Sequence, residues 1–295
     1  MLTVFLQFLL SGITIGSIYA LVGLGFNIIY NATSIINLAQ GEFVVMGGLI
    51  MWFFTQSLEI PFFLSLILTV LIVGLIGLIM ERLTINPLKN TDLLLMIMIT
   101  VAVSIVFRGV LMYKFGKDPY NYPPFTEGEP IIIFGAVIQQ QVLWVLFIAL
   151  GCISLIFLFF NKTMIGKAMS ACAVNPTAAK LVGINVSRMI MLSFFLSAIL
   201  GAIGGIAITP ISLMEYDKGP ALAVKGFCAA IMGGLGNGFG AVIGGFILGI
   251  LESLTAGYIH SGFKDAIALL ILLGILFFKP AGIFGSKSTL TVRKF

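Results

Sequence analysis

Residues 60–80 read IPFFLSLILTVLIVGLIGLIM, a continuous apolar run without a charged side chain. A membrane-spanning helix needs about 20 consecutive apolar residues. A spanning β-strand would show alternating polarity over about ten residues, and no such alternation is present here. A helix also pairs every backbone group within its own segment, as lipid requires. The run therefore predicts a transmembrane helix.

The rest of the chain repeats this pattern. Its 295 residues are 60% hydrophobic and 9% charged, with a mean hydropathy of +1.17, whereas a soluble domain carries about 25% charged residues. We expect an all-α polytopic membrane protein with about eight transmembrane segments. No basic residue precedes the first run, so we expect a first span there and not a cleaved signal peptide. The apolar segments lie at about 4–30, 35–56, 60–80, 93–113, 142–160, 189–212, 226–258 and 263–279.

The segment 226–258 is too long for one span, and GGLGNGFG at 233–240 interrupts it. Glycine-rich backbone at membrane depth is tolerated where protein or a water-filled cavity covers it. We therefore expect a discontinuous helix pair whose first half either crosses the membrane or re-enters it. An odd number of crossings must follow 213–226 if that stretch lies outside and the C-terminal tail lies inside.

Basic residues set the expected orientation, because short cytoplasmic connectors are enriched in Lys and Arg. The connector 161–188 contains four basic residues and no acid, so we place it in the cytoplasm. The tail 286–295 is also basic and is placed there too. The connectors 114–141 and 213–225 carry charges of both signs and are expected outside. The basic residues of the first connector are Lys162, Lys167, Lys180 and Arg188.

Polar residues beside an apolar run are candidates for a translocation path. Asn37, Gln40 and Glu42 lie in SIINLAQGEF at 34–43. Polar groups in a membrane are costly and usually face a bundle interior or a pathway. The alternative is that these residues cap a helix at the membrane interface. The glycine break supplies the other candidates for the path, which are Gly233, Gly234 and Asn237.

The sequence offers little for catalysis. It has one histidine, three widely separated cysteines, and neither a Gly-x-Ser-x-Gly nor an ATP-binding loop motif. We expect neither an enzyme nor a metal or cofactor site on this chain, and the few basic residues do not favour nucleic-acid binding. These observations leave transport as the predicted function. An ion-coupled carrier would usually bury acids near the midplane between repeated halves, and we recognise neither feature in the sequence.

The basic connector contains AVNPTAAKLVGI at 173–184. Ala and Leu favour helix and Pro suits a helix start, so we expect short helices interrupted at Asn175–Pro176. A surface helix that offers Ala178, Ala179 and Leu181 would fit a groove on a partner protein. The alternative is a basic loop that only fixes the topology.

Several stretches, taken in order, resemble the permease subunits of branched-chain amino-acid ABC importers, and more narrowly the LivH type. The resemblance runs from about residue 11 to residue 285. Permeases of ribose and galactose importers are similar to a lesser degree. The stretches are GSIYALVGLGFNIIY, SIINLAQGEF, ERLTINPLK, GKAMSACAVNPTAAKLVGIN, AIMGGLGNGFGAVIGGFILGILESL and FKDAIALLILLGILFFKPAGIFG.

The resemblance implies an ABC importer permease bundle over residues 1–285. It also implies that TAAKLVG at 177–183 is the ATPase-docking motif, in which such permeases have Glu-Ala-Ala followed four residues later by Gly. Here Thr177 replaces the acid, and the later Ile and Pro of that motif are not evident. The implied docking residues are Thr177, Ala178, Ala179, Lys180, Leu181 and Gly183.

The same resemblance implies the partners and the place of action. These are a second homologous permease, two cytosolic ABC ATPases that use ATP and Mg, an extracytoplasmic substrate-binding protein, and the bilayer of the inner membrane. Selectivity would lie largely in the binding protein, so urea or short amides are alternative cargoes for the same kind of importer. An autonomous ion-coupled carrier is the alternative from a different class.

Overall fold

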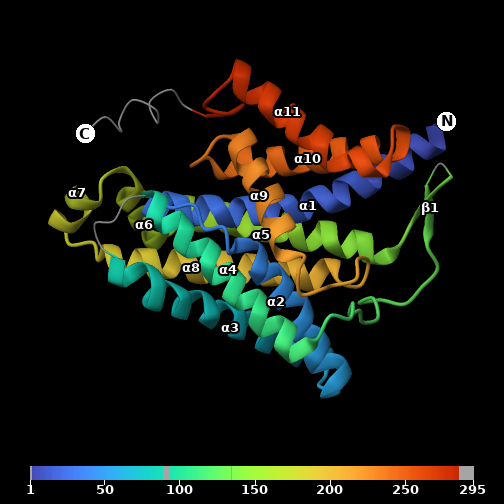
Figure 1. Cartoon of the computed structure of the whole chain (residues 1–295), viewed down its shortest axis with the longest axis horizontal. Coiled ribbons are helices and arrows are strands. Elements are labelled where there is room, and N and C mark those ends of the chain that lie inside the picture. Colours follow the sequence, from blue (N-terminus) through green and yellow to red (C-terminus); the bar gives the residue numbers. More distant parts are fainter. Residues whose placement is uncertain (1, 89–92, 134, 286–295) are drawn as a thin grey trace.

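The computed structural model describes residues 2–88, 93–133 and 135–285, so the tail 286–295 lies outside the described residues. Long helices lie side by side and end at two opposite ends of the molecule (Figure 1). Seven helices in the described part of the chain are long and apolar enough to cross a membrane. This confirms the expected polytopic helical fold. The long helices are α1 (Leu2–Thr33), α3 (Phe62–Met80), α4 (Leu93–Phe115), α5 (Gln140–Lys162), α8 (Val186–Ile208), α10 (Gly238–Tyr258) and α11 (Lys264–Phe278).

Four shorter helices complete the bundle. Two of them, α6 (Met164–Val174) and α7 (Pro176–Leu181), follow α5 at one end of the molecule, where the chain breaks at Asn175 as expected. The other two, α2 (Gln40–Trp52) and α9 (Gly219–Gly233), lie in the middle of the bundle (Figure 1). Single irregular turns lie at Phe53–Ser57, Glu81–Ile85, Asn86–Leu88 and Ser261–Phe263.

The predicted discontinuous pair is α9 and α10, separated by a turn at residues 234–237. The pair begins earlier than expected, at Gly219, because Pro220 suits the first turn of a helix. Helix α9 runs from the interior of the bundle to the turn at residues 234–237, and the chain returns along α1 through α10 (Figure 1). After this connector, α10 and α11 are each long and apolar enough to cross a membrane, whereas α9 is a shorter apolar helix of 15 residues. Whether α9 crosses or re-enters therefore stays a prediction.

A short β-hairpin interrupts the otherwise helical chain. Strand β1 (Ile131–Ile133) pairs antiparallel with β2 (Ala136–Ile138) in the connector before α5. The side chain of Gln7 in α1 donates to the carbonyl oxygen of Val137 at 3.0 Å and accepts from its N–H at 2.9 Å. We call this end of the bundle, which also holds the N-terminus, the hairpin end, and we call the opposite end the α7 end (Figure 1).

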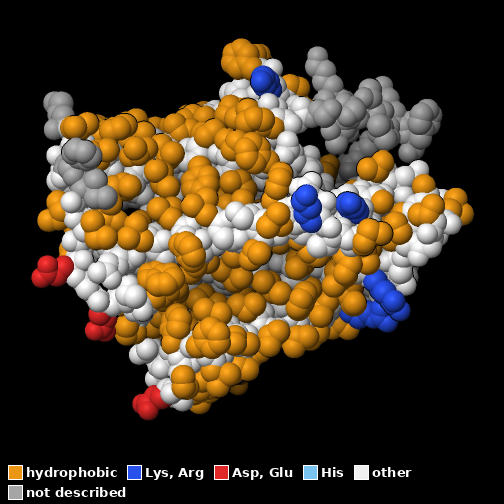
Figure 2. Space-filling view, turned by 180° about the vertical axis from the view of Figure 1, so that it is seen from behind, with side chains coloured by type: hydrophobic (Ala, Val, Ile, Leu, Met, Phe, Trp, Pro, Cys, Tyr) orange, Lys and Arg blue, Asp and Glu red, His pale blue; other side chains and the backbone are white. Residues whose placement is uncertain are grey.

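The core is built by close contact between small residues. Helix α1 runs antiparallel to α10, and a Cβ on Gly16 or Gly249 would collide with the backbone of the other helix. Small residues allow helix backbones to approach in a membrane, where apolar side chains alone do not drive association. Acidic side chains lie at one end of the face seen in Figure 2, basic ones lie from its middle toward the other end, and apolar side chains cover much of the face between them.

Candidate functional site

Helices α2 and α9 begin inside the bundle, and their first turns meet. A Cβ on Gly41 in α2 would collide with the carbonyl oxygen of Gly219, the first residue of α9. The side chain of Gln40 lies against Gly25 of α1, which is eight residues before the helix ends at Thr33. At 1.5 Å per residue, α2 therefore starts about 12 Å from the end of α1. The predicted segment 35–56 is thus helical only from Gln40 onward.

The side chain of Gln40 is buried and hydrogen-bonded at both ends of its amide. Its Nε2 donates to the carbonyl oxygen of Ser197 in α8 at 3.0 Å. The Ser197 hydroxyl lies 2.6 Å from Gln40 Oε1 and 2.9 Å from the carbonyl oxygen of Gly25. Gln40 thus ties α2 to α1 and α8, and both ends of its amide are occupied within the chain.

Asn37 shapes the turn before α2. Its Oδ1 accepts from the N–H of Ala39 at 3.1 Å, and its carbonyl oxygen accepts from the N–H of Gln40 at 3.1 Å. The residue is buried, and its Nδ2 has no hydrogen-bond partner among the described residues. Asn37 thus shapes the turn before α2 and does not cap the helix, because the N-cap residue is Ala39 and no described side chain caps α2.

Glu42 is buried in the first turn of α2. Its Oε1 accepts from the hydroxyl of Ser104 in α4 at 2.7 Å, and its Oε2 has no hydrogen-bond partner in the described structure. Gly219 packs directly against the carboxylate, so any side chain at position 219 would displace it. The carboxylate lies at the N-termini of α2 and α9, where the partial positive charge of a helix favours an anion.

A second buried acid lies in α10. Glu252 Oε1 is 2.6 Å from Lys225 Nζ, and Glu252 Oε2 accepts from the hydroxyl of Tyr19 at 2.8 Å. Lys225 Nζ also lies 2.8 Å from Asp265 Oδ1, so it joins α9 to both α10 and α11. Glu252 is therefore buried six residues before the end of α10, and it is linked through Lys225 to Asp265, which is 59% exposed at the start of α11. A single acid in a long apolar run barely changes its hydropathy, so the run alone could not show whether Glu252 is buried.

The glycine break forms a tightly packed turn toward the α7 end. Asn237 Oδ1 accepts from the N–H of Gly240 at 3.1 Å and caps α10. Gly234 has φ of +103° and packs against the backbone of Gly285, while Gly233 packs against Gly240. Glycine adopts this left-handed conformation at little cost.

The two groups of candidate path residues lie on different sides of α1. Gly25 faces Gln40, whereas Asn27 Oδ1 accepts from the N–H of Gly236 at 2.7 Å. Residues two apart on a helix point about 200° away from each other. The structure therefore does not place the two groups in the lining of a single path. The first group is Asn37, Gln40 and Glu42, and the second is Gly233, Gly234 and Asn237.

The candidate docking residues lie at the α7 end, mostly on the surface. Asn175 Oδ1 accepts from the N–H of Ala178 at 2.9 Å and caps α7, and Gly183 ends it with φ of +87°. Leu181 is 84% exposed. Ala179 differs, since it is buried against Cys172 and Val186 and holds the helix in place. The exposed members of the set are Thr177, Ala178, Lys180, Leu181 and Gly183.

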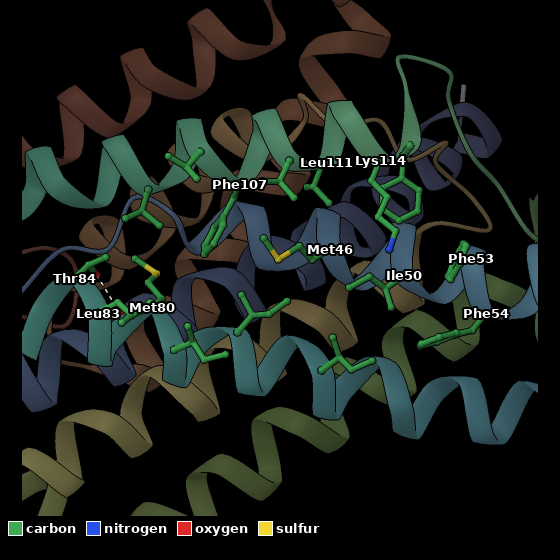
Figure 3. A pocket seen from close by; sticks show the side chains of 17 residues that line it. Met46, Ile50, Phe53, Phe54, Met80, Leu83, Thr84, Phe107, Leu111 and Lys114 are labelled. Atoms are coloured by element: carbon green, nitrogen blue, oxygen red, sulfur yellow. Dashed lines mark hydrogen bonds between the residues drawn. The ribbon is translucent and has the colours of Figure 1, made fainter.

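An apolar groove of about 720 Å³ lies between α2, α3 and α4 (Figure 3). Helix α2 and the turn that follows it form the floor through Met46, Ile50 and Phe53, and α4 contributes Phe107 and Leu111 to one wall. Figure 3 shows Met46 and Phe107 pointing into the same space. The sequence does not predict this groove, because the apolar runs alone do not show which of their faces meet.

Long apolar helices around a buried polar centre define a multi-pass membrane protein. The chain belongs to the family described as branched-chain amino acid transport system / permease component, which matches residues 8–278. It is therefore a permease subunit of the ABC importer type in the inner membrane, as the sequence predicted.

Named relatives span almost the whole chain. It is 29% identical to the high-affinity branched-chain amino acid transport system permease protein LivH of Salmonella typhimurium, over 95% of this chain and 96% of the relative. It is 26% identical to the corresponding protein BraD of Pseudomonas aeruginosa, with the same coverage. Among solved structures, PsaBC from Streptococcus pneumoniae in complex with Fab has a similar fold, with a TM-score of 0.51 and 17% identity over 97% of this chain and 94% of that one.

Proposed function

We propose that this chain forms one half of the translocation path of an ATP-driven importer of branched-chain amino acids. The observation that carries the proposal is the family match along residues 8–278. The relatives LivH and BraD, which align with 95% of the chain, are named as permeases of high-affinity branched-chain amino acid transport. The chain itself would bind no cofactor, and ATP and Mg would be used by partner subunits.

Helix α7 is the proposed contact with the ATPases. Ala178, Leu181 and Val182 are exposed, and exposed apolar clusters mark interaction sites. The surrounding connector 161–188 carries basic residues without an acid, which favours the cytoplasmic side. Two cytosolic ABC ATPases would bind there, one on this chain and one on a second, homologous permease. Closure of the ATPases on ATP would move α7 and tilt the bundle.

The hairpin end is the proposed contact with an extracytoplasmic substrate-binding protein. The two connectors there, 114–141 and 213–225, are tied together through backbone hydrogen bonds between Tyr120 and Met214, at 2.9 and 2.8 Å. Gln7 fastens the hairpin to α1. An ordered surface suits a binding protein that must dock in one orientation before it releases its amino acid.

Reconstitution of the complete importer in proteoliposomes tests this proposal. With the binding protein outside and ATP inside, we expect uptake of labelled leucine that stops without ATP. Uptake of labelled urea but not leucine would contradict the cargo and favour the importer of urea or short amides. Uptake by this chain alone, driven by an ion gradient, would contradict ATP coupling and favour an autonomous carrier.

A further inference from the structure

A polar stripe runs along α4 and faces the start of α2. Thr100, Ser104 and Arg108 are spaced four residues apart, so they lie on one side of the helix. The Thr100 hydroxyl accepts from the N–H of Leu38 at 3.2 Å, and Ser104 donates to Glu42. Arg108 is the next residue of this stripe toward the hairpin end.

Arg108 is half-buried within a membrane-spanning helix. It forms no ion pair within 4.0 Å in the part of the chain that the structure describes. It lies one turn beyond Ser104 on the same side of α4, and Ser104 donates to Glu42. Asp217 is exposed two residues before α9, the helix whose first residue packs against the Glu42 carboxylate. An ionisable residue inside a membrane is costly and usually faces a pathway.

One oxygen of the Glu42 carboxylate is free to accept hydrogen bonds. Buried polar atoms in proteins are usually hydrogen-bonded, yet only Oε1 of Glu42 has a partner, the Ser104 hydroxyl. Two helix N-termini stabilise its negative charge without supplying a cation. A carboxylate with one free oxygen is suited to accept a hydrogen bond from an ammonium group.

We propose that Glu42 and Arg108 form a zwitterion-binding subsite in the translocation path. Glu42 Oε2 accepts hydrogen bonds from the α-ammonium group of an amino acid, and the Arg108 guanidinium donates to its α-carboxylate. This subsite rests on the proposed function, and it specifies the cargo as a free amino acid. A neutral cargo such as urea would need neither charge.

The apolar part of the cargo has a matching surface. Met46 follows Glu42 by one turn of α2, and Phe107 precedes Arg108 in α4. Both line the apolar groove between α2, α3 and α4, and both point into it (Figure 3). We place the aliphatic side chain of the amino acid against these two residues, which extends the inference to amino acids with apolar side chains.

Two charge-removing substitutions in the complete reconstituted importer test the subsite. Glu42→Gln keeps the volume and removes the charge, and Arg108→Gln removes the other charge. We expect each to lower leucine uptake at least about tenfold, because each removes a hydrogen bond to a charged group. ATP hydrolysis stimulated by the loaded binding protein is expected within about twofold of wild type, since docking and the ATPases are untouched. Glu42→Asp, which keeps the charge, is expected to restore part of the uptake.

Glu59→Gln is the matched control, because it makes the same change at an exposed acid just beyond α2. It should leave uptake unchanged. Uptake by Glu42→Gln and Arg108→Gln within about twofold of wild type would overturn the subsite. So would a loss of uptake that parallels a lower melting temperature and lower ATP hydrolysis, because that pattern indicates a structural role. Arg108→Gln keeps the test valid if Glu42→Gln fails to fold, since Arg108 has no ion pair to lose in the described chain.

The wild-type importer separates failure of the subsite from failure of the proposed function. If the wild type does not take up leucine, the proposed function is wrong, and the subsite proposal that rests on it is wrong too. If the wild type takes up leucine and the charge-removing variants do so equally well, only the subsite is wrong.

Discussion

Glu42 and Gln40 show how two polar residues on one helix turn take different roles. Both are buried at the start of α2. The Gln40 amide uses both of its ends on Ser197, whereas Glu42 uses only one oxygen, on Ser104. The sequence predicted both as candidates for the path, because position along an apolar run cannot show which hydrogen bonds are satisfied. Only packing against α4, α8 and α9 distinguishes them.

The contact between Gly41 and Gly219 sets how closely the two helix starts approach. Gly41→Ala would force its Cβ against the carbonyl oxygen of Gly219, and overpacking of this kind costs about 1–3 kcal/mol. We expect a lower melting temperature of the purified chain and a lower folded yield. Gly109→Ala is the control, since no atom lies within 4 Å of the added Cβ. A melting temperature of Gly41→Ala equal to that of Gly109→Ala would contradict the tight contact.

At the scale of elements, the long helices and the break before α10 could be predicted from the sequence. Continuous apolar runs identify spans by length, and the Gly-rich stretch at 233–240 interrupts one of them. The start of α9 at Gly219 was missed because residues 213–225 mix charges and look like a connector. The hairpin of β1 and β2 was missed because three residues per strand are too few for a periodic pattern.

Helix α7 offers a direct test of ATPase docking. Leu181 is 84% exposed, so Leu181→Glu should leave the fold and the melting temperature unchanged. A charge in an apolar contact is costly, so we expect the ATPase subunits to be lost from the purified complex. Leu58→Glu makes the same change at a residue that is 51% exposed and lies after α2, and it should keep the ATPases bound. If the full amount of ATPase subunits copurifies with the Leu181→Glu variant, the prediction that the ATPases dock on α7 is contradicted.

The ion pairs of Lys225 connect three helices, α9, α10 and α11. Lys225→Met would leave Glu252 buried with only the Tyr19 hydroxyl as a partner. Removal of one member of a buried ion pair costs about 3–5 kcal/mol, so we expect a clearly lower melting temperature. The double variant with Glu252→Gln should recover most of this loss, because no unpaired charge remains buried. A melting temperature of Lys225→Met equal to that of the wild type would show that the pair does not stabilise the bundle.

At the scale of the whole molecule, the proposed mechanism requires a fixed orientation in the membrane. The proposed ATPase contact lies at the α7 end, and the proposed binding-protein contact lies at the hairpin end (Figure 1). Charges of opposite sign gather toward these two ends on the face in Figure 2. The sequence predicted this orientation from connector charges alone, but it could not show that α2 and α9 start inside the bundle. That arrangement depends on glycine contacts between segments that are far apart in the chain.

Single cysteines labelled from one side of the membrane test this orientation. In a variant without Cys152, Cys172 and Cys228, we expect Ala178→Cys to react with a membrane-impermeant maleimide only in inside-out vesicles. Ser212→Cys, in the connector after α8, should react only in intact cells. Both residues are exposed on the isolated chain, so accessibility should depend on the side of the membrane. If Ala178→Cys reacts from outside, α7 cannot reach a cytosolic ATPase, and the coupling of this permease to ATP hydrolysis through α7 is excluded.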